Sequence, residues 1–278
     1  MRKLEPGIHT DLARRKSYGG YLQLDKILSA QAPLSSPAHH DEMLFIIQHQ
    51  VAELWFKLMI HELEALAQAF REDRLHRAQK TLLRVKRIQH QMIDQWSVLN
   101  TLTPSEYAEF RHVFGDASGF QSPQYRLVEF LLGNRNAALA ELHKHSDYWY
   151  TRLKQTLSAP SVYDEFLISM CRQGFDIPEV CTERDFSHTR DVNTGVVRAL
   201  KAIYNDPETH WPQYEICESM MDVANNFQLW RFSHMKSVER VIGHKRGTGG
   251  SSGVSFLKRA MDEEFFPELI QVRTEIGR

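Results

Sequence analysis

The chain is poor in cysteine, with three cysteines in 278 residues and no Cys-x-x-Cys pair among them. Zinc ribbons, thiolate-bound iron–sulfur clusters and covalent c-type haem attachment need closely spaced cysteines, so these classes are excluded. An odd number of thiols without a pattern also fits a reducing compartment. We therefore expect a cytoplasmic protein without a disulfide framework.

The sequence also lacks an excess of one charge and a long apolar run. Lys plus Arg total 34 against 35 for Asp plus Glu, which gives no electrostatic reason to expect a nucleic-acid partner. No stretch approaches the 18 or so apolar residues typical of a membrane span, and the first residues lack the apolar core of a signal peptide. These absences predict neither nucleic acid nor membrane as a partner.

Strand-type alternation is lacking too, whereas almost every long segment has helical periodicity. We expect long helices over about 37–70, 75–99 and 207–242, and shorter ones that begin at Thr103-Pro104 and Ser122-Pro123. Ser or Thr followed by Pro is typical of a helix start. Without a repeat or a long linker, the whole chain is interpreted as one all-α domain, a bundle of long helices.

Two histidines lie on the apolar faces of long predicted helices. His234 shares its face with Trp230 and Val238, and His49 shares its face with Phe45, by the spacing of neighbours on one side of a helix. A single buried histidine is most often bonded to a carbonyl group and has no further role. Two of them could instead ligate and guard opposite sides of one site, although spacing alone does not show that they meet.

The usual metal and phosphate motifs do not fit the spacing. A His-Glu-x-x-His helix is absent, and only one Glu-x-x-His, residues 109–112, occurs where a di-iron bundle needs two. The glycine-rich run 247–253 lacks the Lys-Ser/Thr ending of a phosphate loop and follows a helix rather than a strand. It is either an anion-binding nest or a plain loop.

Some polar residues allow a functional and an ordinary interpretation. Arg111 stands at the end of a short helix with Tyr107 one turn before it, so it could pair with a substrate carboxylate or be a surface residue. Ser118 could offer a hydroxyl in a tight loop. Tyr18 and Tyr21 flank two glycines and could form an aromatic flap or the start of a helix.

Together these segments resemble the tryptophan 2,3-dioxygenase family in its compact bacterial form. The similarity extends from about residue 5 to residue 274, and the run after the His-Met of the last long helix is its most specific part. The matching segments are residues 17–22, 39–50, 102–107, 118–122, 125–133 and 230–253.

The resemblance implies haem b, held non-covalently between helices with His234 as the proximal axial ligand. Trp96 and Tyr125 match residues of the haem pocket, and Ser118 matches a loop residue that lies over the haem and the substrate. His49 matches the catalytic residue that faces the indole N–H of the substrate; whether it removes that proton or only positions the ring is left open.

The resemblance also implies a site for L-tryptophan. Arg111 matches the residue that pairs with the substrate carboxylate, with Tyr107 near it, and Thr248 matches the loop residue that contacts the ammonium and carboxylate groups. Phe45 matches the aromatic residue beside the indole ring, and Gly119 belongs to the loop over the pocket.

Tyr18 and Tyr21 match residues that reach the pocket of a neighbouring subunit. The resemblance therefore implies a homotetramer in which residues 1–36 pack on a neighbour. The implied reaction inserts both atoms of O2 across the indole C2–C3 bond of L-tryptophan and gives N-formylkynurenine, the first step of the kynurenine route of tryptophan catabolism.

Three alternatives stay open at the level of the sequence. A haem-binding gas or redox sensor would share His234 but would not need Arg111, Thr248 and Tyr107. A helical interaction protein would merely bury both histidines. A related haem dioxygenase would act on another indole.

Overall fold

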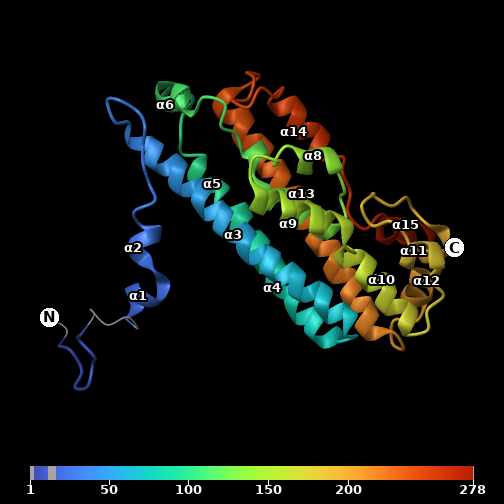
Figure 1. Ribbon diagram of the computed structural model, residues 1–278. Coiled ribbons are helices and arrows are strands. Elements are labelled where there is room, and N and C mark those ends of the chain that lie inside the picture. Colours follow the sequence, from blue (N-terminus) through green and yellow to red (C-terminus); the bar gives the residue numbers. More distant parts are fainter. Residues whose placement is uncertain (1–2, 12–16, 278) are drawn as a thin grey trace.

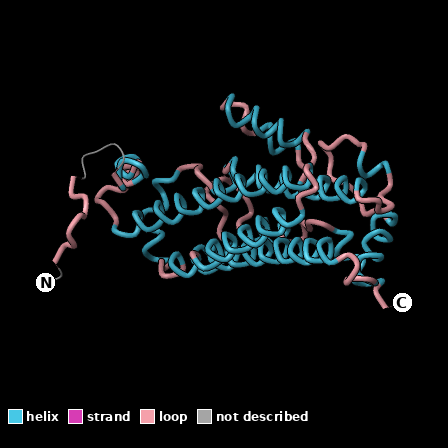
Figure 2. Tube along the Cα trace, turned by 90° about the horizontal axis from the view of Figure 1, so that it is seen from below, coloured by secondary structure: helices cyan, strands magenta, loops and turns pink. Residues whose placement is uncertain are grey.

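The structure of the chain is a computed structural model that describes residues 3–11 and 17–277. These residues form α-helices and short 3₁₀ turns, and no strand is found among them (Figure 2). The prediction of an all-α fold is confirmed.

Three helices form the body of the bundle. These are α3 (His40–Arg71), α4 (Leu75–Asp94) and α13 (Trp211–Ile242), and α4 packs extensively on both of the others (Figure 1). The remaining helices are α1 (Tyr18–Leu22), α2 (Leu24–Ile27), α5 (Trp96–Leu99), α6 (Pro104–Phe110), α7 (Pro123–Leu132), α8 (Ala137–Glu141), α9 (Asp147–Ser158), α10 (Val162–Arg172), α11 (Glu179–Thr182), α12 (Thr194–Asn205), α14 (Val254–Ala260) and α15 (Pro267–Glu275).

The core runs through the contacts between these helices. Each fully buried aromatic ring contributes about 1.5–3 kcal/mol of hydrophobic stabilisation. The largest rings without exposed surface belong to Phe70, Phe110, Phe130 and Phe166, with Phe227 almost as buried.

Local signals in the sequence fix several helix ends. Thr103 and Glu106 form the predicted capping box, in which the Thr103 N–H donates to the Glu106 carboxylate at 2.8 Å. Ser122 caps α7 by accepting the N–H of Tyr125 at 3.1 Å. These side chains satisfy N–H groups that have no partner within the helix.

The predicted helix 75–99 is interrupted, and the prediction of one continuous helix is wrong. α4 ends at Asp94 and α5 begins at Trp96. Between them, the Gln95 carbonyl accepts the side-chain amide of Gln48 from α3 at 2.9 Å. The same carbonyl also accepts the backbone N–H of Val98 at 3.1 Å, and Trp96 stands on a separate short turn.

α3 is buried along its second half and carries exposed apolar side chains along its first half. By length and composition alone α3 could cross a membrane, whereas the sequence predicted no such segment; a core helix passes the same test. The exposed residues recur every three or four positions, and we call them the α3 apolar stripe: Met43, Ile47, Val51, Leu54 and Leu58.

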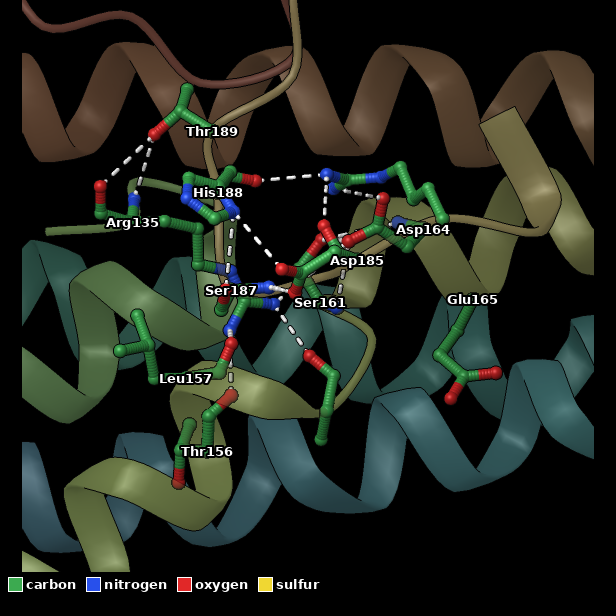
Figure 3. Close-up of polar contacts among 12 residues, drawn as sticks. Arg135, Thr156, Leu157, Ser161, Asp164, Glu165, Asp185, Ser187, His188 and Thr189 are labelled. Atoms are coloured by element: carbon green, nitrogen blue, oxygen red, sulfur yellow. Dashed lines mark hydrogen bonds and ion pairs between the residues drawn. The ribbon is translucent and has the colours of Figure 1, made fainter. Parts of the chain in front are cut away.

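Figure 3 shows a cluster of polar contacts around Asp164. The Arg135 guanidinium donates to the Thr156 and Leu157 carbonyls at 2.5 and 3.0 Å and lies 3.8 Å from the Asp164 carboxylate. Asp164 also accepts from Arg184 at 2.8 Å. We call these residues the Asp164 cluster; it joins the end of α9 to α10 and to the segment after α11.

Candidate functional site

His49 is fixed in one tautomer by the helix that carries it. Its Nδ1 lies 2.7 Å from the Phe45 carbonyl oxygen, so Nδ1 bears the proton and Nε2 keeps a free lone pair. Burial lowers the pKa of His49, although the Phe45 carbonyl and Glu53 oppose this shift. The ring is therefore neutral at pH 7 and can accept a hydrogen bond through Nε2.

His234 projects from α13 toward a second group of aromatic rings. Trp96 stacks on its imidazole with ring centroids 4.9 Å apart, and Trp230 lies at 5.7 Å. Burial lowers the pKa of His234 to about 4, and the nearby His49 contributes to this shift. The two imidazoles therefore lie close enough to influence each other, which the sequence left open.

Two buried polar atoms beside His234 have no hydrogen-bond partner among residues 3–11 and 17–277. The indole Nε1 atoms of Trp96 and Trp230 are buried without a hydrogen-bond acceptor. Among the described residues, no protein group hydrogen-bonds to the His234 ring. An unpaired buried donor costs free energy unless something else accepts from it. A neutral imidazole, spare indole donors and aromatic walls fit the haem that the resemblance implies.

Tyr125 stands in the same aromatic group. Its ring centroid lies 5.6 Å from that of Trp230 and 5.8 Å from that of Phe56. The Arg231 guanidinium, three residues before His234, donates to the Tyr125 hydroxyl at 3.2 Å. Burial raises the pKa of Tyr125 well above its ordinary value, so the phenol stays protonated. The structure brings Tyr125, Trp96 and His234 together, and their haem-binding roles stay predictions.

Phe45 joins His49 to a second aromatic wall. Its ring lies 4.1 Å from the His49 ring, 5.8 Å from Tyr107 and 4.5 Å from Phe114, on which it stacks. Burial raises the pKa of the Tyr107 phenol, and the neighbouring Arg111 guanidinium opposes that rise. Phe114 was missed by sequence reasoning, because only the 3₁₀ turn after α6 turns it toward α3.

Arg111 and Thr248 meet where two loops come together. The Arg111 guanidinium donates to the Arg246 carbonyl, and the Thr248 hydroxyl donates to the Ala117 carbonyl at 2.5 Å. The Arg111 Nε is buried without a partner, which argues against the surface interpretation. Arg111 therefore stands beside Tyr107, and both Arg111 and Thr248 join the loop after α13 to the segment after α6.

Gly249 explains why the loop 247–253 is rich in glycine, and sequence reasoning missed it. A Cβ on Gly249 would lie 2.7 Å from the Ser118 Cβ, so only glycine allows the loop to approach Ser118 and Gly119 so closely. At Gly253, φ is +62° and a Cβ would meet the Lys245 carbonyl oxygen at 2.6 Å. The high glycine content of the loop was the available signal for a close contact. The residue that Gly249 approaches, Ser118, is distant in the sequence, so the contact could not be predicted.

An open hollow adjoins these loops. Its volume is ≈ 540 Å³, and neither His49 nor His234 lines it. Its lining residues are Phe120, Arg246, Gly249, Gly250, Ser251, Ser252, Phe256 and Arg259.

Tyr18 and Tyr21 are not brought to the other site residues within the chain. Their side chains are 77% and 82% exposed, and α1 stands away from the bundle (Figure 1). A role for these tyrosines in the chain's own pocket is therefore not supported, and their reach to a neighbouring pocket stays a prediction.

Comparisons with known proteins cover nearly the whole chain. The model of the tryptophan 2,3-dioxygenase family matches residues 5–165 and 180–276. The chain is 54% identical to the tryptophan 2,3-dioxygenase of Serratia proteamaculans, over 99% of both chains. It is 53% identical to that of Kineococcus radiotolerans, over 99% of this chain and 96% of the relative. Identity to the Xanthomonas euvesicatoria enzyme is 52%, over 100% of this chain and 93% of the relative.

Proposed function

The chain belongs to the tryptophan 2,3-dioxygenase family, and from that premise we propose that it cleaves the indole C2–C3 bond of L-tryptophan with O2 to give N-formylkynurenine. The observation that carries the proposal is the neutral His234 imidazole stacked on Trp96 with ring centroids 4.9 Å apart, beside the buried indole N–H groups of Trp96 and Trp230 that no described residue accepts. The family implies a haem cofactor, and we propose one haem b per subunit. Haem, when bound, supplies the oxygen chemistry.

His234 is proposed to hold the haem iron. A neutral imidazole with a free lone pair is the form that ligates iron, and burial keeps His234 in that form. The unpaired indole N–H groups of Trp96 and Trp230 would donate to acceptors on the cofactor, and Tyr125 would pack beside it. Ser118, in the loop over the pocket, would help to cover it.

His49 is proposed to bind the indole N–H. Since its Nδ1 donates to the Phe45 carbonyl, its Nε2 is the acceptor that an indole N–H requires. Phe45 would lie beside the indole ring, with Phe114 stacked behind it at 4.5 Å. One hydrogen bond and one aromatic contact would hold the indole ring in a single orientation, in which its C2–C3 bond is presented to O2.

Arg111 and Thr248 are proposed to bind the amino acid end of the substrate. A guanidinium can pair with a carboxylate through two parallel hydrogen bonds, and a threonine hydroxyl can bond to the ammonium and the carboxylate. Arg111 now bonds to the Arg246 carbonyl of the loop that carries Thr248. A substrate carboxylate would therefore accept from the Arg111 guanidinium, which already joins the two loops. The carboxylate would then lie near Tyr107 and Gly119.

We also propose a cytoplasmic homotetramer in which residues 1–36 pack on a neighbour. The α3 apolar stripe supports this, since five exposed side chains from Met43 to Leu58 repeat at the spacing of a helix–helix contact. Tyr18 and Tyr21, exposed on α1, would reach a neighbour's pocket. The whole chain is proposed to be one domain.

The decisive experiment is turnover under labelled oxygen. We expect the haem-loaded, reduced protein to convert L-tryptophan and ¹⁸O₂ into N-formylkynurenine in which both inserted oxygen atoms carry the label. A haem spectrum without product would favour a sensor or another indole substrate. The absence of both would return His49 and His234 to the interpretation as buried core residues.

The two faces of the site are distinguished by His49→Ala. We expect this variant to retain haem, because His234 holds the iron, and to lose activity, because the indole N–H loses its acceptor. The measurement is haem content by absorbance alongside product formation. Loss of haem in His49→Ala would mean that the roles of the two histidines are exchanged.

A further inference from the structure

Glu42, in the first turn of α3, is a buried carboxylate bound to the backbone of the segment that precedes the helix. It is 1% exposed. Its two oxygens accept the backbone N–H groups of Leu34 at 2.7 Å and Ser35 at 2.9 Å. Burial opposes the charge, but the hydrogen bonds from Leu34 and Ser35, together with the charge of nearby His39, lower the pKa of Glu42 below its ordinary value. The ionised carboxylate therefore accepts hydrogen bonds from two successive backbone N–H groups.

A second attachment lies two turns further along α3. The Gln50 side chain donates to the Ala30 carbonyl at 2.9 Å and accepts from the Gln31 side chain at 2.6 Å. Gln31 also donates to the Ile27 carbonyl at the end of α2. The segment 30–35 is therefore fastened antiparallel to α3 at two points.

Beyond these attachments the chain extends as an arm, which we define as residues 17–29. Its helices α1 and α2 pack mainly on each other and stand away from the bundle (Figure 1). Tyr18, Tyr21 and Leu28 are 70–82% exposed. Because the arm has little packing of its own against the bundle, its direction is set where the segment 30–35 is held to α3.

The same face of α3 carries both the attachment and the proposed pocket. Glu42 precedes Phe45 by three residues and His49 by seven, so the three side chains follow one helical stripe. A buried carboxylate is costly unless it is hydrogen-bonded, and it persists where its geometry is needed. Because α3 carries both Glu42 and the pocket residues Phe45 and His49, the direction of the arm is fixed relative to the pocket.

We propose that Glu42, supported by Gln50, is a positioning residue for substrate binding in a neighbouring copy of this chain. It sets the direction in which the arm leaves α3, so that Tyr18 and Tyr21 reach the pocket of a second copy. This inference rests on the proposed function and on the proposed association of the subunits.

Glu42→Gln tests the attachment directly. Glutamine keeps one acceptor oxygen but turns an NH₂ group toward the second N–H, so one backbone group loses its partner. In the haem-loaded full chain we expect trypsin to cleave after Lys26 about tenfold faster, and KM for L-tryptophan to rise about tenfold, the effect of one lost buried hydrogen bond. We expect kcat and haem content to stay near those of the parent protein. Parent values for both Lys26 cleavage and KM would overturn the proposal.

Glu268→Gln is the matched control. Glu268 has no exposed surface and accepts the backbone N–H of Asn193 at 3.1 Å, as well as bonding to Arg190, but it lies on α15. We expect it to lower the thermal midpoint without changing KM or Lys26 cleavage. An equal rise in KM in both variants would assign the effect of Glu42 to general destabilisation and overturn its positioning role.

Mixed assemblies separate an effect in the neighbour from an effect in the same chain. Glu42→Gln chains keep an intact pocket, while His234→Ala chains are expected to be inactive but to keep an intact arm. In the co-assembled protein, a KM restored toward the parent value would support the proposal, and a KM that stays raised would overturn it. Lys26 cleavage is measured without substrate, so it still judges the attachment if no form of the protein turns over tryptophan.

Discussion

The Asp164 cluster and the surroundings of His234 are both buried and polar, but they differ in charge: Asp164 pairs with the Arg135 and Arg184 guanidinium groups, whereas the groups around His234 are neutral. Asp164 accepts from the Ser161 N–H and hydroxyl and from Arg184 (Figure 3). Around His234, the buried indole N–H groups of Trp96 and Trp230 have no acceptor in the part of the chain that the structure describes. Buried charges that are paired within the protein hold the fold together. Neutral buried groups that can still form hydrogen bonds indicate a place for a ligand.

The largest expected effect concerns the neutral surroundings of His234. We expect His234→Ala to abolish stable haem binding, because the iron loses its protein ligand while the helices remain packed. Absorbance of the purified protein after haem loading measures this. His61→Ala, an exposed histidine on α3, should bind haem as the parent does. Normal haem content in His234→Ala would disprove the axial-ligand assignment.

In the charged Asp164 cluster, the expected effect is on stability. Asp164→Ala leaves the Arg135 guanidinium, whose side chain is 1% exposed, buried without its carboxylate, which costs about 3–5 kcal/mol. Urea unfolding measures the change, and haem binding should persist below the transition. Asp185→Ala is the control, since Asp185 is exposed beside the cluster and its removal should leave the unfolding curve unchanged. A small effect of Asp164→Ala would mean that the cluster does not hold this end of the bundle.

A smaller effect is expected where the loops meet. Arg111→Ala should weaken L-tryptophan binding by about 2–5 kcal/mol if its contact with the carboxylate is buried. Arg111→Lys should not restore binding, because an ammonium group cannot form the paired contact of a guanidinium. The measurement is KM at saturating oxygen, with thermal stability as the check on folding. An unchanged KM would place Arg111 outside the substrate site.

The smallest effect is expected at Gly249. Gly249→Ala places a Cβ 2.7 Å from the Ser118 Cβ, and relief of such overpacking costs about 1–3 kcal/mol. We expect KM to rise while haem content is kept. The double variant Gly249→Ala with Ser118→Gly removes the clash and should recover part of the loss. No recovery would mean that the close approach of the two loops is not what Gly249 provides.

Local structure was predictable from the sequence wherever the deciding groups are neighbours along the chain. Thr103 and Glu106 lie three residues apart, and their capping box formed as expected. The faces that carry His49 and His234 followed from helical spacing alone. The predicted helix 75–99 was wrong at Gln95, where α4 ends and where the side chain of Gln48, from another helix, bonds to the backbone carbonyl.

The resemblance named the site residues, but residues alone could not bring them together. Arg111 and Arg246 are 135 positions apart, and the hydrogen bond between them exists only because two loops meet. Gly249 could not be predicted as a site residue, because the residue that requires glycine at this position, Ser118, is distant in the sequence. The roles of His49, Arg111, Thr248 and His234 stay predictions until the variants are measured.

By itself, the sequence determined the all-α class, the helix caps and the apolar faces, since each depends on residues within about one or two helical turns of one another. Only the tertiary structure decided that His49 and His234 lie near each other. It also decided that the indole N–H groups of Trp96 and Trp230 find no acceptor among the described residues, and that Glu42 accepts hydrogen bonds from the segment before α3. Those outcomes depend on how separate helices pack, and packing is a property of the whole chain rather than of any local pattern.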